Sequence, residues 1–396
     1  MRGPHNILRL IRTGATLERT GAMPVILNAL DAPRTLKFAA RFIVWPFQFL
    51  GRRGDQSLPP APRALTAMGP AYIKFGQILS TRPDVVGPEL AEQLRVLQDR
   101  LPPFSTGVAK QSFKSEIGLD ADDVFSDFSE PVAAASIAQV HRGELKDTGQ
   151  SVAIKVLRPE IERAFQKDLD TFYFAARLVE FVSPKSRRLK PMDVIAHFDG
   201  VVRGELDLRL ESASASEFLA NIKEDKGFSV PSVNWSLSSR RVMTLDWADG
   251  VPMGDVDALA AAGHNLSELG DRVLHMFLNH ALRDGFFHAD MHQGNLKVSS
   301  SGDIVAFDFG IMGHIDEYTR RVYAEILFGF IKRDYKRVAQ VHFEAGYVPQ
   351  DQDVDEFARA LRAVGEPIFG MDASNISMGR LLSYLFEVTE RFGMET

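Results

Sequence analysis

Two aspartates and an asparagine at fixed spacing constrain this chain more than any other feature of its sequence. Asp290 and Asn295 lie five residues apart, and Asp308 follows thirteen residues after Asn295. Within residues 296–307, two short apolar runs flank a polar segment, a pattern typical of a β-hairpin. Such a hairpin folds Asn295 back toward Asp308, and three oxygen-bearing side chains suit a hard cation such as Mg²⁺. The stretch therefore predicts a metal-dependent site.

The same spacing resembles the catalytic and metal-binding loops of protein kinases. In kinases an H-R-D-x-x-x-x-N loop precedes a D-F-G string, which Asp308-Phe309-Gly310 supplies here. The first aspartate orients or deprotonates the acceptor, whereas the asparagine and the D-F-G aspartate hold Mg²⁺ on the ATP phosphates. Asp290 is thus the candidate catalytic residue, and Asn295 and Asp308 are the candidate metal ligands. A solitary D-F-G would be weak evidence, but order, spacing and the expected hairpin agree.

A strand upstream carries a third kinase-like element. Residues 151–156 read S-V-A-I-K-V, and Lys155 of this V-A-I-K signature is expected to bind the α- and β-phosphates of ATP. The segment before it takes the place of a Gly-rich phosphate loop but is rich in alanine, which lacks glycine's freedom at positive φ. A stiffer loop is therefore expected. Its candidate nucleotide-binding residues are Val132, Ala133, Ala134, Ala135, Ser136, Ile137, Ala138, Gln139 and Val140.

Another motif lies nearer the N-terminus, where residues 69–77 read G-P-A-Y-I-K-F-G-Q. Together with the kinase-like strings, this K-x-G-Q motif resembles the UbiB family of atypical kinase-like proteins, from roughly Ala61 to the end of the chain. The resemblance implies an α+β, kinase-like two-lobe fold whose N-terminal helical extension caps the nucleotide site. It also implies inward-pointing, regulatory roles for Lys74 and Gln77, which are three residues apart and so share one face of a helix.

An acidic segment completes the residues that the resemblance assigns. By resemblance, Glu205 and Asp207 of an E-x-D pattern face Lys74 or a metal, and Glu211 pairs with Lys155 as the αC glutamate does in kinases. Residues two apart point in different directions on one continuous helix. Either a helix begins at this segment, therefore, or only one of the two acids contacts Lys74.

The catalytic loop departs from the UbiB pattern at two positions. Met291 and Gln293 replace the two prolines of H-A-D-P-H-P-G-N, which lowers the rigidity of the loop because proline fixes φ. The departure removes no catalytic group. His288 is expected to orient the loop through hydrogen bonds rather than to take part in chemistry.

Composition excludes several other kinds of site. The chain of 396 residues contains no cysteine, so disulfides, thiolate metal sites and cysteine catalysis are excluded. Its formal charge of −6 argues against nucleic acid as a partner, because such binding requires a basic surface. Residues 1–53 are the exception, with nine Arg or Lys against two acids. The aromatic run 38–50 in this arm either lies on an anionic membrane surface or docks as a helix on the domain.

Four segments are expected along the chain. They are a basic amphipathic arm (1–53), the K-x-G-Q helical extension (54–123), a kinase-like N-lobe with a helical insert (124–250) and a helical C-lobe (251–396). Within the N-lobe, residues 229–245 are expected to supply a strand pair. Family members usually continue into further helices and often a hydrophobic tail, so this chain is expected to be truncated. Nothing in it is apolar for long enough to span a membrane.

The function expected from these features is that of an ATP- and Mg²⁺-dependent kinase or ATPase supporting ubiquinone biosynthesis. No A-P-E string follows Gly310, so the interval that serves ordinary kinases as activation loop and peptide platform is missing. The acceptor is therefore expected to be a lipid, a quinone precursor, another small molecule or water rather than a protein side chain. The expected location is the cytoplasmic face of the inner membrane, beside other ubiquinone-biosynthesis proteins.

Three alternative functions remain open on the sequence. A non-catalytic, nucleotide-switched scaffold for lipid-processing enzymes would bind ATP without net turnover. An accessory factor for a ring-hydroxylation step is the second, although no dinucleotide fingerprint or haem or iron motif supports hydroxylation as the chain's own chemistry. A small-molecule phosphotransferase of the aminoglycoside or choline kinase type is the third, and the K-x-G-Q motif and the alanine-rich loop argue against it.

Overall fold

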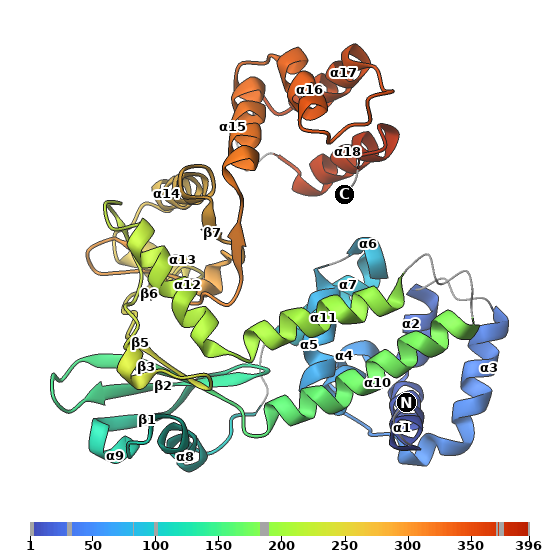
Figure 1. The fold of residues 1–396 in the computed structure, drawn as a ribbon, viewed down its shortest axis with the longest axis vertical. Helices are drawn as coiled ribbons and strands as arrows, with labels where there is room; N and C mark the ends of the chain where they lie inside the picture. Colours follow the sequence, from blue (N-terminus) through green and yellow to red (C-terminus); the bar gives the residue numbers. More distant parts are fainter. Residues whose placement is uncertain are drawn as a thin grey trace. The chain divides into compact units, whose positions relative to one another are not determined.

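The chain divides into two compact units. The computed structural model describes residues 4–29, 34–81, 83–98, 102–182, 190–369, 371 and 376–394 (Figure 1). The first unit combines Met1–Glu217 with Val230–Ala248, and the second combines Phe218–Ser229 with Asp249–Thr396. A short internal segment, 218–229, therefore belongs with the C-terminal part of the chain rather than with its neighbours in sequence.

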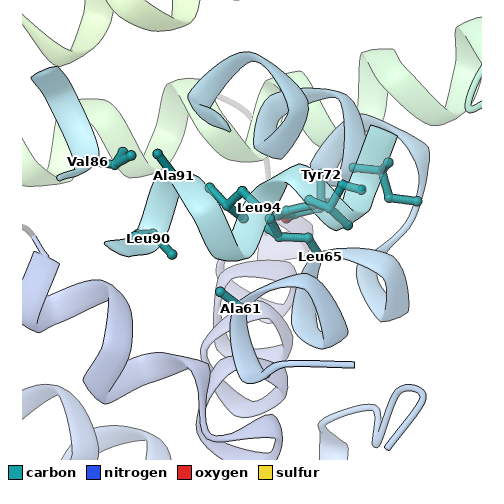
Figure 2. Packing of buried hydrophobic residues seen from close by; sticks show 9 residues of the cluster. Ala61, Leu65, Tyr72, Val86, Leu90, Ala91 and Leu94 are labelled. Atoms are coloured by element: carbon teal, nitrogen blue, oxygen red, sulfur yellow. The ribbon is translucent and has the colours of Figure 1, made fainter. Parts of the chain in front are cut away.

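Short helices build the N-terminal part of the first unit. They are α1 (Pro4–Thr20), α2 (Ala22–Ala29), α3 (Arg34–Val44), η1 (Trp45–Leu50), α4 (Pro60–Met68), α5 (Pro70–Ser80), α6 (Pro83–Val86), α7 (Pro88–Leu94) and η2 (Arg95–Gln98). Proline opens α4 to α7, where its fixed φ suits the first turn and its missing N–H costs no bond. Figure 2 shows their shared core, in which Ala61, Leu65, Tyr72, Leu90 and Leu94 pack together.

The aromatic arm docks on α1 as a helix. Arg41 Nε of α3 pairs with Glu18 Oε1 of α1 at 2.9 Å, and Arg19 of α1 donates to the carbonyl of Gly51 at 2.8 Å. The described aromatic run therefore packs against α1 as a helix, and its attachment to a membrane stays a prediction. It nonetheless exposes seven large apolar side chains, Phe38, Phe42, Ile43, Trp45, Phe47, Phe49 and Leu50.

A four-stranded antiparallel sheet follows in the first unit. Its strands run in the order β1 (Phe125–Ala134), β2 (Ala138–Leu145), β3 (Ser151–Leu157) and β5 (Val242–Asp246), next to α8 (Thr106–Ile117) and α9 (Ala121–Val124). Alternate residues of β3, Val152, Ile154 and Val156, are buried in one core with Phe113 of α8. Because side chains alternate across a strand, Lys155 lies on the opposite face of the sheet.

The expected strand pair within residues 229–245 is wrong. Only β5 joins this sheet, and its other side carries a single isolated bridge, between Val233 and Leu245, beside the short helix η4 (Trp235–Leu237). Serine side chains supply the reason. Ser238 Oγ accepts from the backbone N–H of Thr244 at 3.0 Å, and such side-chain bonds compete with a regular ladder.

Three more helices complete the first unit, and the last of them continues into the second unit. They are α10 (Ile161–Val182), α11 (Pro191–Glu205) and α12 (Leu208–Asn221), and the end of α12 belongs to the second unit. Phe75 of α5, Phe172 of α10 and Phe198 of α11 pack with ring centroids 5.2–5.8 Å apart. This cluster joins the K-x-G-Q helix to the helical insert and to the helix that ends at Glu205.

The second unit contains the predicted hairpin. Strand β8 (Leu296–Val298) pairs antiparallel with β9 (Ile304–Ala306), so the hairpin is confirmed, and the full sheet order is β4 (Phe228–Ser229), β9, β8, β6 (Val251–Pro252). A two-stranded sheet joins β7 (Phe286–His288) to β10 (Met312–His314). The helices are α13 (Val256–Ala261), α14 (Leu266–Asn279), η5 (His280–Asp284), η6 (Gln293–Asn295), α15 (Glu317–Ile331), α16 (Tyr335–Glu344), α17 (Val354–Gly365) and α18 (Met378–Arg391).

The mixture of helices and sheets confirms the expected α+β class. Across the described ranges, no helix combines the length and the apolar character that crossing a membrane requires.

Candidate active site

The lysine of the V-A-I-K strand pairs with the predicted acid. Lys155 Nζ donates to Glu211 Oε1 at 2.6 Å, with the two side chains 18% and 10% exposed. Strand β3 supplies the lysine and the first turn of α12 supplies the glutamate. This contact agrees with what the resemblance implies. Both charges are largely buried, so solvent screens their attraction less than it would at the surface.

The alanine-rich segment forms a tight reversal between β1 and β2. Val132 to Ala134 end β1, Ala138 to Val140 begin β2, and Ala135 N donates to Ala138 O at 2.8 Å. None of the residues 132–140 adopts a positive φ, so the reversal does not need glycine. Gln139 differs from the other residues of this segment, because its buried side chain bonds the backbone of Phe104. It accepts from the Phe104 N–H at 3.0 Å and donates to the Phe104 carbonyl at 3.1 Å.

An arginine that the sequence did not single out holds this reversal. Arg158, directly after β3, donates from Nε to Ala135 O at 3.0 Å and from its backbone N–H to Ile137 O at 2.8 Å. Its Nη1 also donates to Pro102 O at 3.0 Å. Burial lowers the pKa of this guanidinium, although arginine stays charged in the physiological range. The loop is therefore cross-linked at two carbonyls, which gives the expected stiffness a physical cause.

The two polar residues of the K-x-G-Q motif have different partners. Lys74 Nζ lies 2.5 Å from Glu205 Oε1, both side chains being largely buried, and Gln77 Nε2 donates to Leu97 O at 2.7 Å. The glycine between them serves packing. A Cβ on Gly76 would lie 2.5 Å from Leu97 Cδ1 and 2.6 Å from the Cδ1 of a leucine on α4.

The geometry satisfies both of the arrangements that spacing left open for the E-x-D segment. Helix α11 ends at Glu205 and α12 begins at Leu208, so the acids lie on either side of a helix break. Glu205 contacts Lys74, whereas Asp207 forms a two-point pair with Arg209 at 2.8 and 2.6 Å. Those bonds lower the pKa of Asp207. A new helix thus begins here, and only one acid contacts Lys74.

The catalytic loop in the second unit is ordered by hydrogen bonds to its own backbone. His288 Nδ1 accepts from the Asp290 N–H at 3.1 Å, and Asn295 Nδ2 donates to Asp290 O at 3.0 Å. Burial lowers the pKa of His288 while the charge of Asp308 opposes the shift, so a neutral imidazole is favoured. His292 Nδ1 accepts from the Gly294 N–H at 2.9 Å. The hydrogen bond from the Asp290 N–H to His288 Nδ1 agrees with the expected orienting role of His288.

The D-F-G string is brought beside the catalytic loop by the hairpin. Asn295 O accepts from the N–H of Phe307 at 3.3 Å, one residue before Asp308. Asp308 Oδ1 in turn accepts from the Gly310 N–H at 3.0 Å, and Phe309 is fully buried against Phe218 of α12, with ring centroids 5.9 Å apart. The structure therefore brings Asp290, Asn295 and Asp308 together within the second unit.

The side chains at this loop fit a magnesium ion that is shared with phosphate. The amide nitrogen of Asn295 is engaged by Asp290 O, which assigns its oxygen as the remaining acceptor. In the described part of the chain, no three His, Asp or Glu side chains converge to hold a metal by themselves. Mg²⁺ at nucleotide sites takes one or two protein ligands and completes its shell with phosphate oxygens and water. Asn295 and Asp308 match that donor set.

These contacts define a kinase-like protein, since the lysine–glutamate pair and the aspartate–asparagine loop are both formed. A model of the ABC1 atypical kinase-like domain matches residues 96–342, and one of the UbiB helical domain matches residues 361–396. The chain belongs to this family of atypical kinases, on its UbiB branch. The match to the kinase-like domain covers more than half of the sequence.

Individual relatives agree with this assignment. The chain is 41% identical over 337 residues to "Probable protein kinase UbiB" of Aliivibrio fischeri (strain MJ11), covering 84% of this chain and 62% of the relative. The protein of the same name from Marinobacter nauticus is 40% identical, with 84% and 61% covered. The chain thus spans less than two thirds of the length of these relatives.

A solved structure supports the fold alone. Rv3197 of Mycobacterium tuberculosis, in its complex with erythromycin, superimposes with a TM-score of 0.54 at 23% identity, covering 81% of this chain and 88% of the other. The expected kinase-like fold is therefore confirmed.

Proposed function

We propose that this chain acts as an ATP- and Mg²⁺-dependent atypical kinase or ATPase that supports ubiquinone biosynthesis. The Lys155–Glu211 ion pair carries the proposal, since kinases use this pair to hold the ATP phosphates in place. The relatives' name, "Probable protein kinase UbiB", is consistent with it. Support for the pathway comes from that family membership.

Each kinase-like residue has a defined part in the proposal. Lys155 binds the nucleotide phosphates and Glu211 fixes the position of its ammonium group. Asp290, whose backbone is held by His288 and Asn295, orients the acceptor and takes its proton as the new phosphate bond forms. When bound at Asn295 and Asp308, Mg²⁺ supplies charge neutralisation on the phosphate oxygens.

The short connection after D-F-G supports a small or lipid-like acceptor. Strand β10 begins at Met312 and α15 at Glu317, so the chain enters regular structure almost directly after Gly310. Ordinary protein kinases bind their peptide on a long activation segment in this interval. A lipid, a quinone precursor or water fits this proposal better than a protein side chain.

Labelled ATP tests the proposal directly. Wild type and Asp308→Asn receive γ-labelled ATP, Mg²⁺ and a lipid extract, and the destination of the label is followed. Label on an organic species indicates a kinase, and lipid-stimulated release of phosphate indicates an ATPase; both should fall at least about 100-fold in the variant. Asp303→Asn, a change on the exposed turn of the same hairpin, is the matched control.

The outcome also separates the proposal from the scaffold. ATP binding without transfer or hydrolysis in wild type would favour the non-catalytic, nucleotide-switched scaffold. Full turnover by a folded Asp308→Asn variant would contradict the assigned metal ligand.

Peripheral membrane attachment forms part of the same proposal. The exposed face of α3 and η1 combines Phe38, Phe42 and Trp45 with the cations Arg34 and Arg41 of the same segment. Aromatic and basic side chains on one amphipathic helix favour an anionic bilayer surface. We place this arm on the cytoplasmic face of the inner membrane.

A further inference from the structure

A cleft in the first unit is lined by more positive charge than its surroundings neutralise. It has a volume of about 470 Å³ and lies among α1, the junction of α4 with α5, and the first turns of α10. Its five cationic side chains are Arg9, Arg12, Arg52, Arg163 and Lys167. The kinase-like residues Lys155 and Glu211 do not line it.

Among the described residues that line this cleft, two are acids, and one of them is already engaged. Glu160 Oε2 accepts from Arg163 at 2.7 Å. The other acid, Asp168, is held by burial at a raised pKa of about 6, although the charges on Arg9 and Arg52 oppose that shift. With five cations against two acids, the lining keeps a net positive charge even when both acids are ionised.

Neutral backbone groups hold two of the guanidinium groups in place. Arg9 Nη1 donates to the carbonyl of Lys167 at 2.9 Å, and Arg52 Nη1 donates to the carbonyl of Ala67. A carbonyl orients a guanidinium without cancelling its charge, and the fork of five N–H donors retains further capacity. These arginines are therefore positioned in advance for an anion.

Hydroxyl groups and an apolar edge complete the lining. Thr13 Oγ1 and the buried Tyr72 hydroxyl form a hydrogen bond of 2.9 Å, and burial raises the pKa of Tyr72 to about 12, so the phenol stays neutral and can donate. Met68 adds an apolar surface. Leu8, 68% exposed, is one helical turn before Arg12 and so shares its face of α1.

We infer that this cleft binds a ligand through a phosphate monoester or diphosphate group. Guanidinium groups match phosphate oxygens with paired hydrogen bonds, and a pocket of this size accommodates a headgroup or a small phosphorylated metabolite. The phosphate belongs either to a soluble molecule or to a lipid whose apolar part lies along Leu8 and Met68. The site is additional to the proposed nucleotide site and does not depend on catalytic activity.

Direct binding tests the inference on the full chain. Inorganic pyrophosphate, followed by calorimetry, is the soluble probe. Vesicles of phosphatidylcholine with and without phosphatidic acid, followed by co-flotation, are the lipid probe. The test variant is Arg12→Gln/Lys167→Gln, whose two side chains are exposed. Lys223→Gln/Arg359→Gln, which removes two exposed cations of the second unit, is the matched control.

The double variant should bind its phosphate probe at least about tenfold more weakly, whereas the control pair should bind like wild type. Loss of pyrophosphate binding assigns a soluble ligand, and loss confined to phosphatidic acid vesicles assigns a lipid headgroup. The loss caused by the double variant should persist in a Lys155→Met background, which separates this cleft from the nucleotide site. The inference is overturned if wild type binds neither probe, if the double variant binds both normally, or if Lys155→Met alone abolishes binding.

Discussion

Arg158 holds the backbone of the alanine-rich reversal, which stands where a kinase has its Gly-rich loop. A Gly-rich loop adapts to phosphate through backbone freedom, whereas the alanine-rich reversal keeps ordinary φ values and is tied at Ala135 and Ile137 by this residue. The stiffness expected from alanine content is thus reinforced from outside the loop. A nucleotide entering such a loop meets a nearly fixed backbone.

Arg158→Gln should therefore loosen the loop. Loss of the hydrogen bonds to Ala135 O and Pro102 O is expected to lower the free energy of unfolding by about 1–3 kcal/mol. It should also raise the KM for ATP more than it lowers kcat. Urea denaturation and nucleotide titration measure the two effects.

Arg163→Gln, which removes an exposed ion pair with Glu160 and no hydrogen bond to the reversal, should change stability by about 0.5 kcal/mol or less. Equal effects of the Arg158 and Arg163 variants on KM would contradict the cross-linking role.

Asp168 predicts a specific dependence of stability on pH. Burial raises the pKa of Asp168 to about 6, well above the usual range of an aspartate, so the folded chain keeps its proton over a window in which the unfolded chain loses it. The free energy of unfolding should then fall as the pH rises from about 4 to 6, by roughly 1–3 kcal/mol from this group.

Asp168→Asn should remove that part of the slope, as measured by chemical denaturation at several pH values. Asp170→Asn, on the same helix, should retain it. A slope that is identical in wild type and Asp168→Asn would disprove the assignment.

Several residues could be assigned from the sequence and others could not. Lys155, Asp290, Asn295 and Asp308 were predicted because each sits in a string of fixed local spacing, and their catalytic roles stay a prediction. Arg158 belongs to no such string, and its importance arises from carbonyls more than twenty residues away. The sequence could not decide which acid pairs with Lys74, because residue spacing does not show that a helix ends at Glu205.

At the scale of elements, local signals predicted hairpins better than long-range pairs. The β8–β9 hairpin followed from two apolar runs around a turn, and the β3 strand from its V-A-I-K signature. The strand pair within residues 229–245 failed because serine and asparagine side chains take up backbone hydrogen bonds there. Gln139 looked like part of a phosphate loop, yet its side chain binds Phe104, which only the folded chain brings close.

The aromatic arm gives a prediction at the same scale. Phe42→Ser/Trp45→Ser should weaken binding to anionic vesicles at least about tenfold, because each buried aromatic side chain contributes about 1.5–3 kcal/mol. Flotation with vesicles measures the effect. Phe328→Ser/Trp235→Ser removes an equally sized exposed pair elsewhere, at 61% and 52% exposure, and should have little effect.

Undiminished flotation of the arm variant would remove the arm from the membrane proposal. The arm would then have a structural role alone, the packing of α3 against α1 through Arg41 and Glu18.

At the scale of the molecule, the two units are interleaved in sequence. Family membership and the α+β class could be predicted from motif order, but the assignment of residues 218–229 to the second unit could not, because β4 pairs with a strand some seventy-five residues later. The four expected segments stay a prediction. The chain's span of 62% of its Aliivibrio fischeri relative leaves the whole protein's partners as proposals.

Interleaving predicts that the second unit needs its early segment. A fragment of residues 249–396 would lack β4, the aromatic contact of Phe218 with Phe309, and Asp225, which Arg283 binds at 2.7 and 2.9 Å. We expect this fragment to show no cooperative thermal transition by circular dichroism. Fusing residues 218–229 to it through a flexible linker should restore one.

A scrambled version of the same twelve residues is the control and should not restore the transition. Cooperative unfolding of the unfused fragment would show that the early segment is dispensable.

The packing around Gly76 predicts which mutations in the K-x-G-Q motif can be suppressed by further mutations. Glycine is required at position 76 because there is no space for a side chain: an added methyl group would collide with the side chains of Leu97 and Leu65. A defect caused by Gly76→Ala can therefore be suppressed by changes that shorten both of those leucines. A defect at Lys74 has no such suppressor, because its ammonium charge cannot be replaced by making space. One motif thus combines two kinds of physical constraint, one on space at Gly76 and one on charge at Lys74.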